Sequence, residues 1–497
     1  MKVHPLVLAL LMAGWAAAQD NQPQPLKVTT KTCGSYSVRL AENGFDEPDD
    51  KVSLIKNGKT YVTLSDTMVE MQQCGDITGD GIPEVVLMQF SGGAHCCATH
   101  SVYSLTTPPR RILETFTGHG DSLEVEQLDG RGPKEIVNTD WRFAYDLGMS
   151  FADSPALPRI YSLVGGQYVE NTRAFPAWLL KQVTPASAKN FAGGDALYSY
   201  SLYLLAGKPA AADAYLKTLP KTYAAWLNNY APDIRQRLSS AGIEDWPARA
   251  GVPDSARVSG IGGSFSRAGT LEYLGLIGSG QQATLRLYRA EGNKIVGSGA
   301  LATFTGSDQQ GWFPSFTVRR STGRDDAVVA DRSGGGLGYP VYRVGPQGAT
   351  RLTNDPLAVA SGLLADVSTV AQYVQRRYDD SSDKPLSAAQ IAELDRKISL
   401  SAARAQPWAA LLSSKIDLPK LGMFSVNALE VSRETAQSAL VAGTVEIASV
   451  KDNKLSYDSG RYTVAIFLEN RGGTWMVSKW QLTPRTGNFE DTYPAQQ

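Results

Sequence analysis

Short runs of β-favouring residues, separated by turn residues, constrain the fold of this chain most strongly. From about residue 33 to residue 170, runs rich in Val, Ile, Thr, Tyr and Phe alternate with clusters of Gly, Asp, Asn and Pro. Such runs predict strands and such clusters predict tight turns. The expected strands are Tyr36–Leu40, Glu84–Phe90, Thr99–Leu105, Glu135–Asn138 and Arg159–Leu163. The first third of the chain is therefore expected to be an antiparallel β region.

The pattern changes to helical spacing after residue 180. Apolar residues such as Ala196, Leu197 and Tyr200 recur three or four positions apart, as on one face of a helix. Three prolines are expected to divide this segment into three or four short helices: Pro209, Pro220 and Pro232. Six aromatic residues could form a ligand-binding stripe, but this spacing favours helix–helix packing. They are Tyr198, Tyr200, Tyr203, Tyr215, Tyr223 and Trp226.

Strand patterns return after residue 251, and the chain ends in a different kind of module. Thr284–Tyr288 and Ala327–Ala330 are expected strands of a second β region. Beyond a polar linker, a helix and a curved antiparallel sheet are expected, which together predict a small α+β module. The helix is Ala388–Leu412, and the strands are Ser438–Ala448, Arg461–Glu469 and Thr474–Leu482. The hairpin formed by Val464–Leu468 and Gly472–Trp475 resembles the last hairpin of nuclear-transport-factor-like or cystatin-like folds.

The N-terminus predicts export. Lys2 precedes an apolar stretch from Leu6 to Ala17, and Ala16-Ala17-Ala18 fits an A-x-A cleavage site. The stretch is too short to span a bilayer, and no later segment approaches the roughly 20 apolar residues that a spanning helix needs. We therefore expect an extracytoplasmic protein, periplasmic or secreted, without an integral membrane segment.

Chain length and net charge limit the number of domains and the kinds of binding partner to expect. A chain of 497 residues suggests about three domains. With 48 Lys and Arg against 49 Asp and Glu, the net charge of −1 gives no reason to expect binding to nucleic acid or to anionic lipid. The expected architecture is β-rich and multidomain: 1–18 signal peptide, 19–180 β domain, 181–250 helical segment, 251–380 second β-rich domain and 385–497 C-terminal α+β module.

Four cysteines in an oxidising compartment predict disulfides. They are Cys33, Cys74, Cys96 and Cys97. A bond between the adjacent Cys96 and Cys97 would close a strained eight-membered ring. We therefore expect each of these two to pair with Cys33 or Cys74, in an order that the sequence leaves open.

One loop carries the clearest chemical signal. In Asp76-Ile77-Thr78-Gly79-Asp80-Gly81-Ile82-Pro83-Glu84, oxygen-bearing side chains occupy positions 1, 3, 5 and 9, and glycines at positions 4 and 6 permit a tight turn. Ca²⁺ takes six to eight oxygen ligands, and this spacing supplies them together with a backbone carbonyl and water. The apolar residues after Glu84 predict a strand, so the loop is not an EF-hand. A simple Asx-type β-turn without an ion is the alternative.

The loop resembles the FG-GAP/VCBS repeat of integrin-α-like β-propellers, mainly over residues 70–140. The resemblance implies Ca²⁺ ligands at Asp76, Thr78, Asp80, Ile82 (through its backbone) and Glu84. Thr78 stands where the family usually has Asp or Asn, so we expect a weak site with a Kd on the order of 10⁻⁴–10⁻³ M.

Repeats of the loop support this resemblance. Residues 127–135 align with 76–84 at an offset of 51 residues, a plausible length for one four-stranded propeller blade. Gln127 and Arg131 replace two of the acids there, and the Arg131 guanidinium could take the place of the ion and pair with Asp129 or Glu135. A third, partial repeat at Gly263–Leu274 keeps only the turn and the start of the strand, and residues 322–329 are a fourth, weaker match.

Two other sites compete with the calcium loop. The first is a transition-metal site formed by His95, Cys96, Cys97, His100 and His119. Cys96 and His100 would lie about 13 Å apart along one strand, which argues against a shared tetrahedral zinc. The second is a carbohydrate-hydrolase cleft formed by Asp140, Asp146 and Asp153, with aromatic residues between them.

The sequence favours a non-enzymatic protein over both alternatives. The expected function is recognition of a protein or glycan, or scaffolding, at the cell envelope, since nothing in the sequence assembles a nucleophile. The expected cofactor is Ca²⁺.

Overall fold

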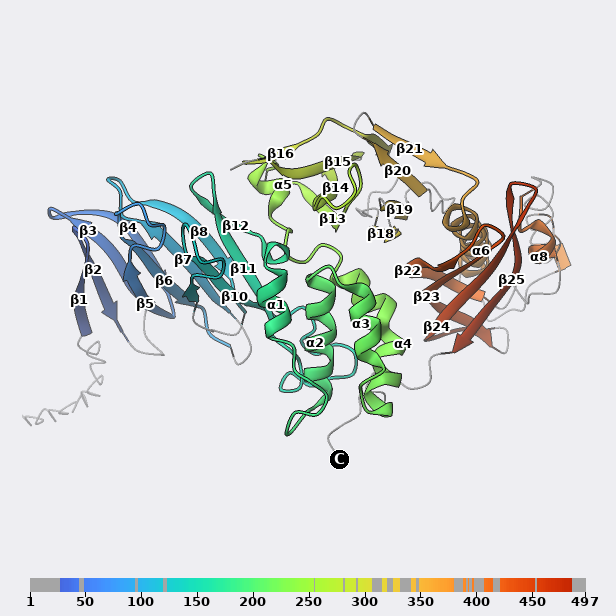
Figure 1. Cartoon of the computed structure of the whole chain (residues 1–497), viewed down its shortest axis with the longest axis horizontal. Helices are drawn as coiled ribbons and strands as arrows, with labels where there is room; N and C mark the ends of the chain where they lie inside the picture. Colours follow the sequence, from blue (N-terminus) through green and yellow to red (C-terminus); the bar gives the residue numbers. More distant parts are fainter. Residues whose placement is uncertain are drawn as a thin grey trace, which may run out of the picture. The chain divides into compact units, whose positions relative to one another are not determined.

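The computed structural model describes residues 27–484 with gaps at 44–48, 94–96, 119–122, 254, 280–281, 292–293, 306–314, 320–324, 331–340, 346–347, 380–387, 390–391, 393–395, 397–405, 414–420 and 452–453. The described part is β-rich, with six antiparallel sheets and a helical segment between the third and the fourth (Figure 1). It divides into two compact units. The first extends to about residue 120, except for Ile77–Gly79, which belong with the second.

The first unit contains two four-stranded meanders that share a core. One sheet consists of β1 (Lys27–Cys33), β2 (Tyr36–Glu42), β3 (Asp50–Lys56) and β4 (Lys59–Asp66). The other consists of β5 (Met68–Gly75), β6 (Glu84–Phe90), β7 (Ala98–Ser104) and β8 (Arg110–Phe116). The alternating residues of β2 bury one face, whereas the apolar run that opens β6 is buried throughout. Tyr36, Leu54, Val85 and Leu87 lie in the shared core.

The second unit begins with a third meander and continues into helices. The meander consists of β9 (Glu124–Glu126), β10 (Glu135–Asp140), β11 (Leu157–Val164) and β12 (Gln167–Glu170). A 3₁₀ turn, η1 (Thr172–Ala174), leads to α1 (Pro176–Lys181), α2 (Gly193–Leu205), α3 (Pro209–Leu216), α4 (Lys221–Arg237) and α5 (Trp246–Arg249). Pro209 begins α3 and Pro220 precedes α4, as expected, but Pro232 lies inside α4 instead of dividing it.

Sheet and helices share one core in this part of the chain. Phe143, Leu147 and Met149 from the β10–β11 connection pack among the helices with Leu197 and Trp226. The two units therefore separate near residue 120, within the region 19–180 that the sequence treats as one domain.

Two further sheets confirm the second β region. The first consists of β13 (Arg257–Gly263), β14 (Glu272–Ser279), β15 (Gln282–Glu291), β16 (Lys294–Gly297) and β17 (Ala302–Thr305), which pairs with β15. The second consists of β18 (Ser315–Arg319), β19 (Asp326–Ala330), β20 (Val341–Gly345) and β21 (Gly348–Leu352).

The C-terminal module is α+β, as expected, but its main helix lies elsewhere. The long helix α6 (Pro356–Asp379) packs on the sheet of β22 (Leu421–Glu434), β23 (Ser438–Lys451), β24 (Lys454–Arg471) and β25 (Thr474–Pro484). The sequence placed these helical residues in the second β region. Most of the expected helix 388–412 lies outside the described residues, apart from elements such as α8 (Ala409–Ser413). Among the described helices, none has both the length and the hydropathy to cross a bilayer.

Candidate functional site

The predicted calcium loop, which we call loop 1 (Asp76–Glu84), connects β5 to β6. Gly79 and Gly81 adopt left-handed backbone angles, with φ of +76° and +84°, and this turn requires glycine because other side chains strain there. Asp76 Oδ2 accepts a hydrogen bond from the Gly81 N–H at 3.0 Å, and Asp80 Oδ1 accepts one from the Ile82 N–H at 2.8 Å. The acids at positions 1 and 5 thus hold the turn closed.

The oxygens of loop 1 differ in their exposure. Asp76 and Asp80 are exposed, Thr78 and Ile82 are half-buried, and the Glu84 side chain is fully buried at the start of β6. Within the described residues, no group of three or more His, Cys, Asp or Glu side chains is arranged to hold a metal. Loop 1 therefore offers a hard cation two exposed carboxylates with neutral oxygens. Such a donor set fits Ca²⁺, which accepts hydroxyl, carbonyl and water oxygens, at low affinity.

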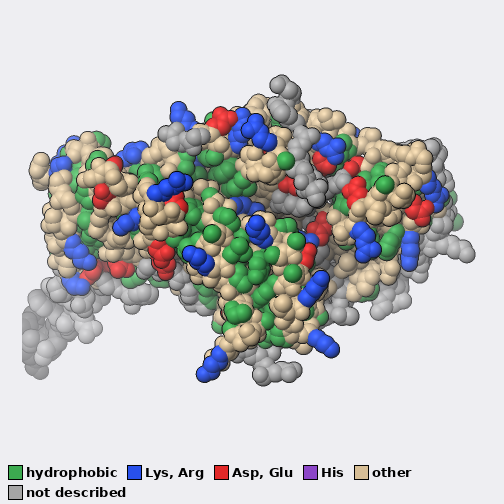
Figure 2. Space-filling model, viewed as in Figure 1, with side chains coloured by type: hydrophobic (Ala, Val, Ile, Leu, Met, Phe, Trp, Pro, Cys, Tyr) green, Lys and Arg blue, Asp and Glu red, His purple; other side chains and the backbone are tan. Residues whose placement is uncertain are grey.

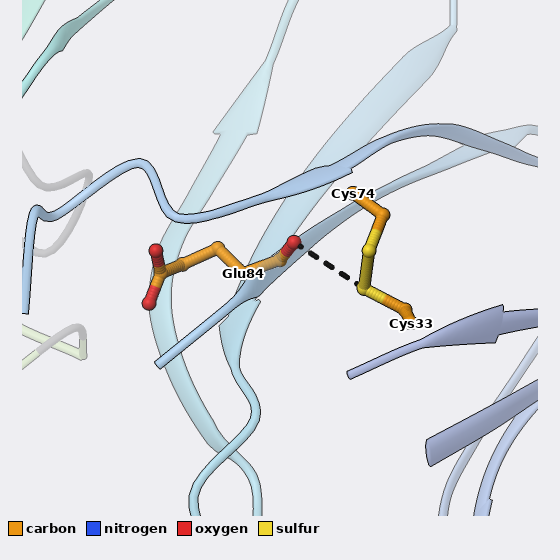
Figure 3. Close-up of a disulfide and its surroundings, with 3 residues drawn as sticks. All are labelled: Cys33, Cys74 and Glu84. Atoms are coloured by element: carbon orange, nitrogen blue, oxygen red, sulfur yellow. Dashed lines mark hydrogen bonds between the residues drawn. A yellow bond between two sulfur atoms is a disulfide. The ribbon is translucent and has the colours of Figure 1, made fainter. Parts of the chain in front are cut away.

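A disulfide fixes the start of loop 1 and lies beside its end. Cys74 lies two residues before Asp76 and is bonded to Cys33, with the two Cα atoms 5.8 Å apart. Figure 3 shows this bond beside Glu84, whose carbonyl oxygen lies 3.6 Å from Cys33 Sγ. The expectation that Cys33 and Cys74 bond to Cys96 and Cys97 is therefore wrong. The sequence could not reveal the correct pair, because pairing depends on which strands lie side by side. Cys97 is also disulfide-bonded, and Cys96 lies outside the described residues.

The first β-turn also supports the loop. Gly34, between β1 and β2, has φ of +56°, and a Cβ at this position would clash with the ring of Pro83. On the other side of the loop, the Leu105 N–H donates to the Pro83 carbonyl at 3.0 Å. The end of loop 1 is thus fixed by packing and by a hydrogen bond.

Loop 2 (Gln127–Glu135) has the same backbone form as loop 1. Gly130 and Gly132 have φ of +78° and +73°, matching Gly79 and Gly81 at the predicted offset. Here Gln127 Nε2 donates to the Gly132 carbonyl at 3.0 Å, so an amide closes the turn where loop 1 uses a carboxylate.

The acids of loop 2 serve its own backbone and its arginine. Asp129 Oδ1 accepts from the Arg131 N–H at 3.0 Å. The expected ion pair between Arg131 and Asp129 is present at 3.9 Å, on an exposed guanidinium. The turn of loop 2 is therefore closed by its own side chains.

The last residue of each loop has a role that the sequence did not reveal. Glu135 Oε2 accepts from the Leu128 N–H at 2.9 Å, and burial raises the pKa of Glu135 while this hydrogen bond opposes the rise. In the third, partial repeat, Glu272 Oε2 accepts hydrogen bonds from the N–H groups of Phe265 and Ser266 at 2.8 and 2.7 Å. Buried acids begin the second strand of four meanders: Glu84, Glu135, Glu272 and Asp326. An acid placed directly before an apolar strand was the signal available in the sequence.

No protein-family model, curated protein or solved structure matches this chain. What the loops can bind therefore follows from their own geometry and chemistry.

Among the acids of the alternative hydrolase cleft, Asp140 and Asp146 are bound to arginines. Asp140 is buried and pairs with Arg142, whose Nε lies 2.7 Å from Asp140 Oδ2, and Asp146 pairs with Arg237. Asp153 Oδ2 instead accepts from the Ser150 hydroxyl at 2.7 Å. Each of the three carboxylates thus has a structural partner.

The alternative His/Cys site is only partly described. His100 is fully buried in β7, and Cys97 is committed to a disulfide. The remaining residues, His95, Cys96 and His119, lie outside the described part of the chain.

The aromatic residues of the helical segment form its core. Tyr200, Tyr215 and Trp226 are buried, and Tyr198, Tyr203 and Tyr223 pack against them, half-buried. Hydrophobic side chains also gather on the visible face of the helices in Figure 2. Helix packing, the interpretation that the sequence favoured, accounts for these aromatic residues.

Proposed function

We propose that this chain is an extracytoplasmic, non-enzymatic recognition protein of the FG-GAP/VCBS type, in which loop 1 binds one Ca²⁺. One observation carries the proposal: loops 1 and 2, 51 residues apart, share their left-handed glycines and their place between the first two strands of a meander. A propeller-type repeat predicts such recurrence, and a single Asx turn does not.

The charge of loop 1 distinguishes it from loop 2. Asp76 and Asp80 place two exposed carboxylates on one turn, where Thr78 and the Ile82 carbonyl add neutral oxygens. Loop 2 has Gln127 and Arg131 at the corresponding positions. Its exposed acid, Asp129, is paired with Arg131, so loop 2 offers a cation less negative charge than loop 1. Glu84, which the resemblance adds as a ligand, occupies the position of Glu135 and Glu272, whose carboxylates accept hydrogen bonds from backbone N–H groups. A bound Ca²⁺ neutralises the two exposed acids and stiffens the turn.

Export and recognition rest on separate features. The N-terminal pattern and the Cys33–Cys74 disulfide are typical of proteins in an oxidising, extracytoplasmic compartment. Rigid meanders that present loops at their ends suit the binding of a partner at the envelope.

Thermal melting tests the calcium site. For a Kd on the order of 10⁻⁴–10⁻³ M, 10 mM Ca²⁺ stabilises the folded state by about 1.4 to 2.7 kcal/mol relative to EGTA, because the ion binds only the folded loop. Asp80→Asn keeps an oxygen for the Ile82 N–H but removes a charge, and should abolish the shift in melting temperature.

Asp129→Asn in loop 2 is the control, since Asp129, like Asp80, accepts a hydrogen bond from the N–H group two residues further on, here that of Arg131. It should leave the calcium-dependent shift unchanged. A wild-type protein whose melting temperature does not respond to 10 mM Ca²⁺, or an Asp80→Asn variant that responds like the wild type, would exclude loop 1 as a calcium site.

A further inference from the structure

The connection between β10 and β11 is a rigid loop with an exposed ring at its surface. We call residues 141–154 the aromatic loop. Phe143, Leu147 and Met149 anchor it in the helical core, each at most 4% exposed. The indole N–H of Trp226 on α4 donates to the Leu147 carbonyl at 3.1 Å. These contacts fix the loop to the helices.

Three aromatic side chains of the loop form one cluster. Trp141 and Phe151 are stacked, with ring centroids 4.7 Å apart and planes 17° apart. Tyr145 lies against Phe151 at 5.5 Å, and it remains 60% exposed. A large aromatic side chain is normally buried more deeply than this, so the cluster presents ring surface to solvent.

The backbone of the loop is strained at the exposed ring. Tyr145 and Leu147 adopt left-handed backbone angles, with φ of +57° and +53°. Residues other than glycine rarely adopt these angles. The Tyr145 N–H is held by Ser154 Oγ at 3.2 Å, and the intervening Asp146 is held by Arg237. Strain of this kind persists only where the surroundings enforce it, and it is concentrated at functional sites.

We propose that the aromatic loop binds a neutral oligosaccharide by stacking a sugar ring on the Tyr145–Phe151–Trp141 cluster. The inference rests on the proposed recognition function and names its ligand class. The faces of aromatic rings carry partial negative charge and attract the C–H groups that line a sugar face. In the same loop, the Asp153 carboxylate accepts from the Ser150 hydroxyl at 2.7 Å and keeps further acceptor capacity for a sugar hydroxyl, while its charge disfavours anionic ligands.

Size and chemistry favour a glycan over a protein partner. A stable protein interface buries about 800 Å² on each partner, whereas the cluster presents one well-exposed ring on a short loop. Binding without cleavage is expected, because Asp140 and Asp146 are engaged by Arg142 and Arg237.

Calorimetric titration with cellohexaose, chitohexaose, maltohexaose and xylohexaose tests the proposal on the full-length chain. At least one of them should bind, and Tyr145→Ala should weaken that binding at least tenfold. Tyr145→Phe keeps the ring and should stay within about threefold of the wild type. Phe116→Ala removes a similarly exposed ring (56%) from β8 and should have no effect.

Circular dichroism and the melting temperature of each variant show whether it is folded, and the Tyr145→Phe result stands even if Tyr145→Ala fails to fold. Binding to none of the four oligosaccharides would overturn the proposal. Binding that neither variant changes would also overturn it. If the calcium-dependent melting shift persists in either case, the proposed calcium site stands and only the glycan inference fails.

Discussion

At the scale of single residues, the pKa of the buried acid Glu170 is raised far above its usual value. Glu170 is the last residue of β12, and its side chain is buried. Burial raises its pKa to about 8, and the nearby acids Glu244, Asp245 and Asp140 also raise it. The positive charge of Arg159 opposes this rise. Its Oε1 accepts from the Gly242 N–H at 2.9 Å and lies 3.4 Å from Arg159 Nε. The third meander is thus joined to the segment between α4 and α5 through a carboxyl group that stays protonated to a higher pH than usual.

This perturbation predicts a pH dependence of opposite sign to that of an ordinary surface acid. Between pH 4.5 and about 8 the folded chain keeps the Glu170 proton that the unfolded chain releases. Folding stability therefore falls as pH rises through this window, by at most about 1.4 kcal/mol per pH unit. Glu170→Gln cannot ionise, so its urea midpoint should fall less than that of the wild type between pH 5.5 and pH 8.

Asp153→Asn changes an acid of the same unit outside this cluster and serves as the control. It should follow the wild-type pH profile. Parallel profiles for wild type and Glu170→Gln would show that the Glu170 proton does not contribute to folding.

The sequence revealed only part of the candidate site at this scale. Asp76, Gly79, Asp80 and Gly81 were identifiable because a tight turn is determined by neighbouring residues. The role of Glu135 depends on a hydrogen bond to Leu128 across a folded turn, and the Cys33–Cys74 bond depends on the packing of two sheets. Such contacts between distant residues leave no local pattern.

At the scale of elements, strands were predictable and one helix was not. Expected strands such as Glu84–Phe90 are present because their β-branched and apolar runs end at clear turn residues. Helix α6 was missed although its pattern is present: Ala360, Leu363, Leu364, Val367 and Ala371 are buried at helical spacing after Pro356. The Leu357 N–H also donates to the Asp355 carboxylate at 2.9 Å, as at a capped helix start.

Gly362, in the middle of α6, provides a test of this packing. Alanine normally stabilises a helix interior by about 1 kcal/mol relative to glycine. Here a Cβ would lie 2.9 Å from Trp408 Cζ2 and closer still to Cη2, and the ring is held by a 2.7 Å hydrogen bond from Nε1 to Asp366. Gly362→Ala should therefore destabilise the module by about 1–3 kcal/mol, measured by urea denaturation.

A second substitution separates the clash from other effects. Trp408→Phe shortens the ring that meets the new Cβ, so Gly362→Ala should cost less in the Trp408→Phe background than in the wild type. A Gly362→Ala variant as stable as the wild type, or more stable, would contradict the packing of α6 against Trp408.

At the scale of the whole molecule, the sequence predicted the β-rich multidomain class but not how the chain divides. The reason lies in shared cores: Phe143 and Leu147 leave the third meander and pack among the helices. Val169 of the same sheet packs with Trp246 of α5 and Tyr273 of β14. Apolar side chains that join elements far apart in the chain decide which sheets belong to one unit, and composition does not show this.

We propose that loop 1, and not its counterpart loop 2, binds Ca²⁺. A TROSY NMR titration of the ¹⁵N-labelled chain to 10 mM Ca²⁺ tests it residue by residue. We expect saturable shifts of the Thr78–Ile82 amides, no comparable shifts of the Asp129–Gly132 amides, and loss of the response in Asp80→Asn. Unmoved loop 1 amides, or shifts confined to another part of the chain, would contradict it.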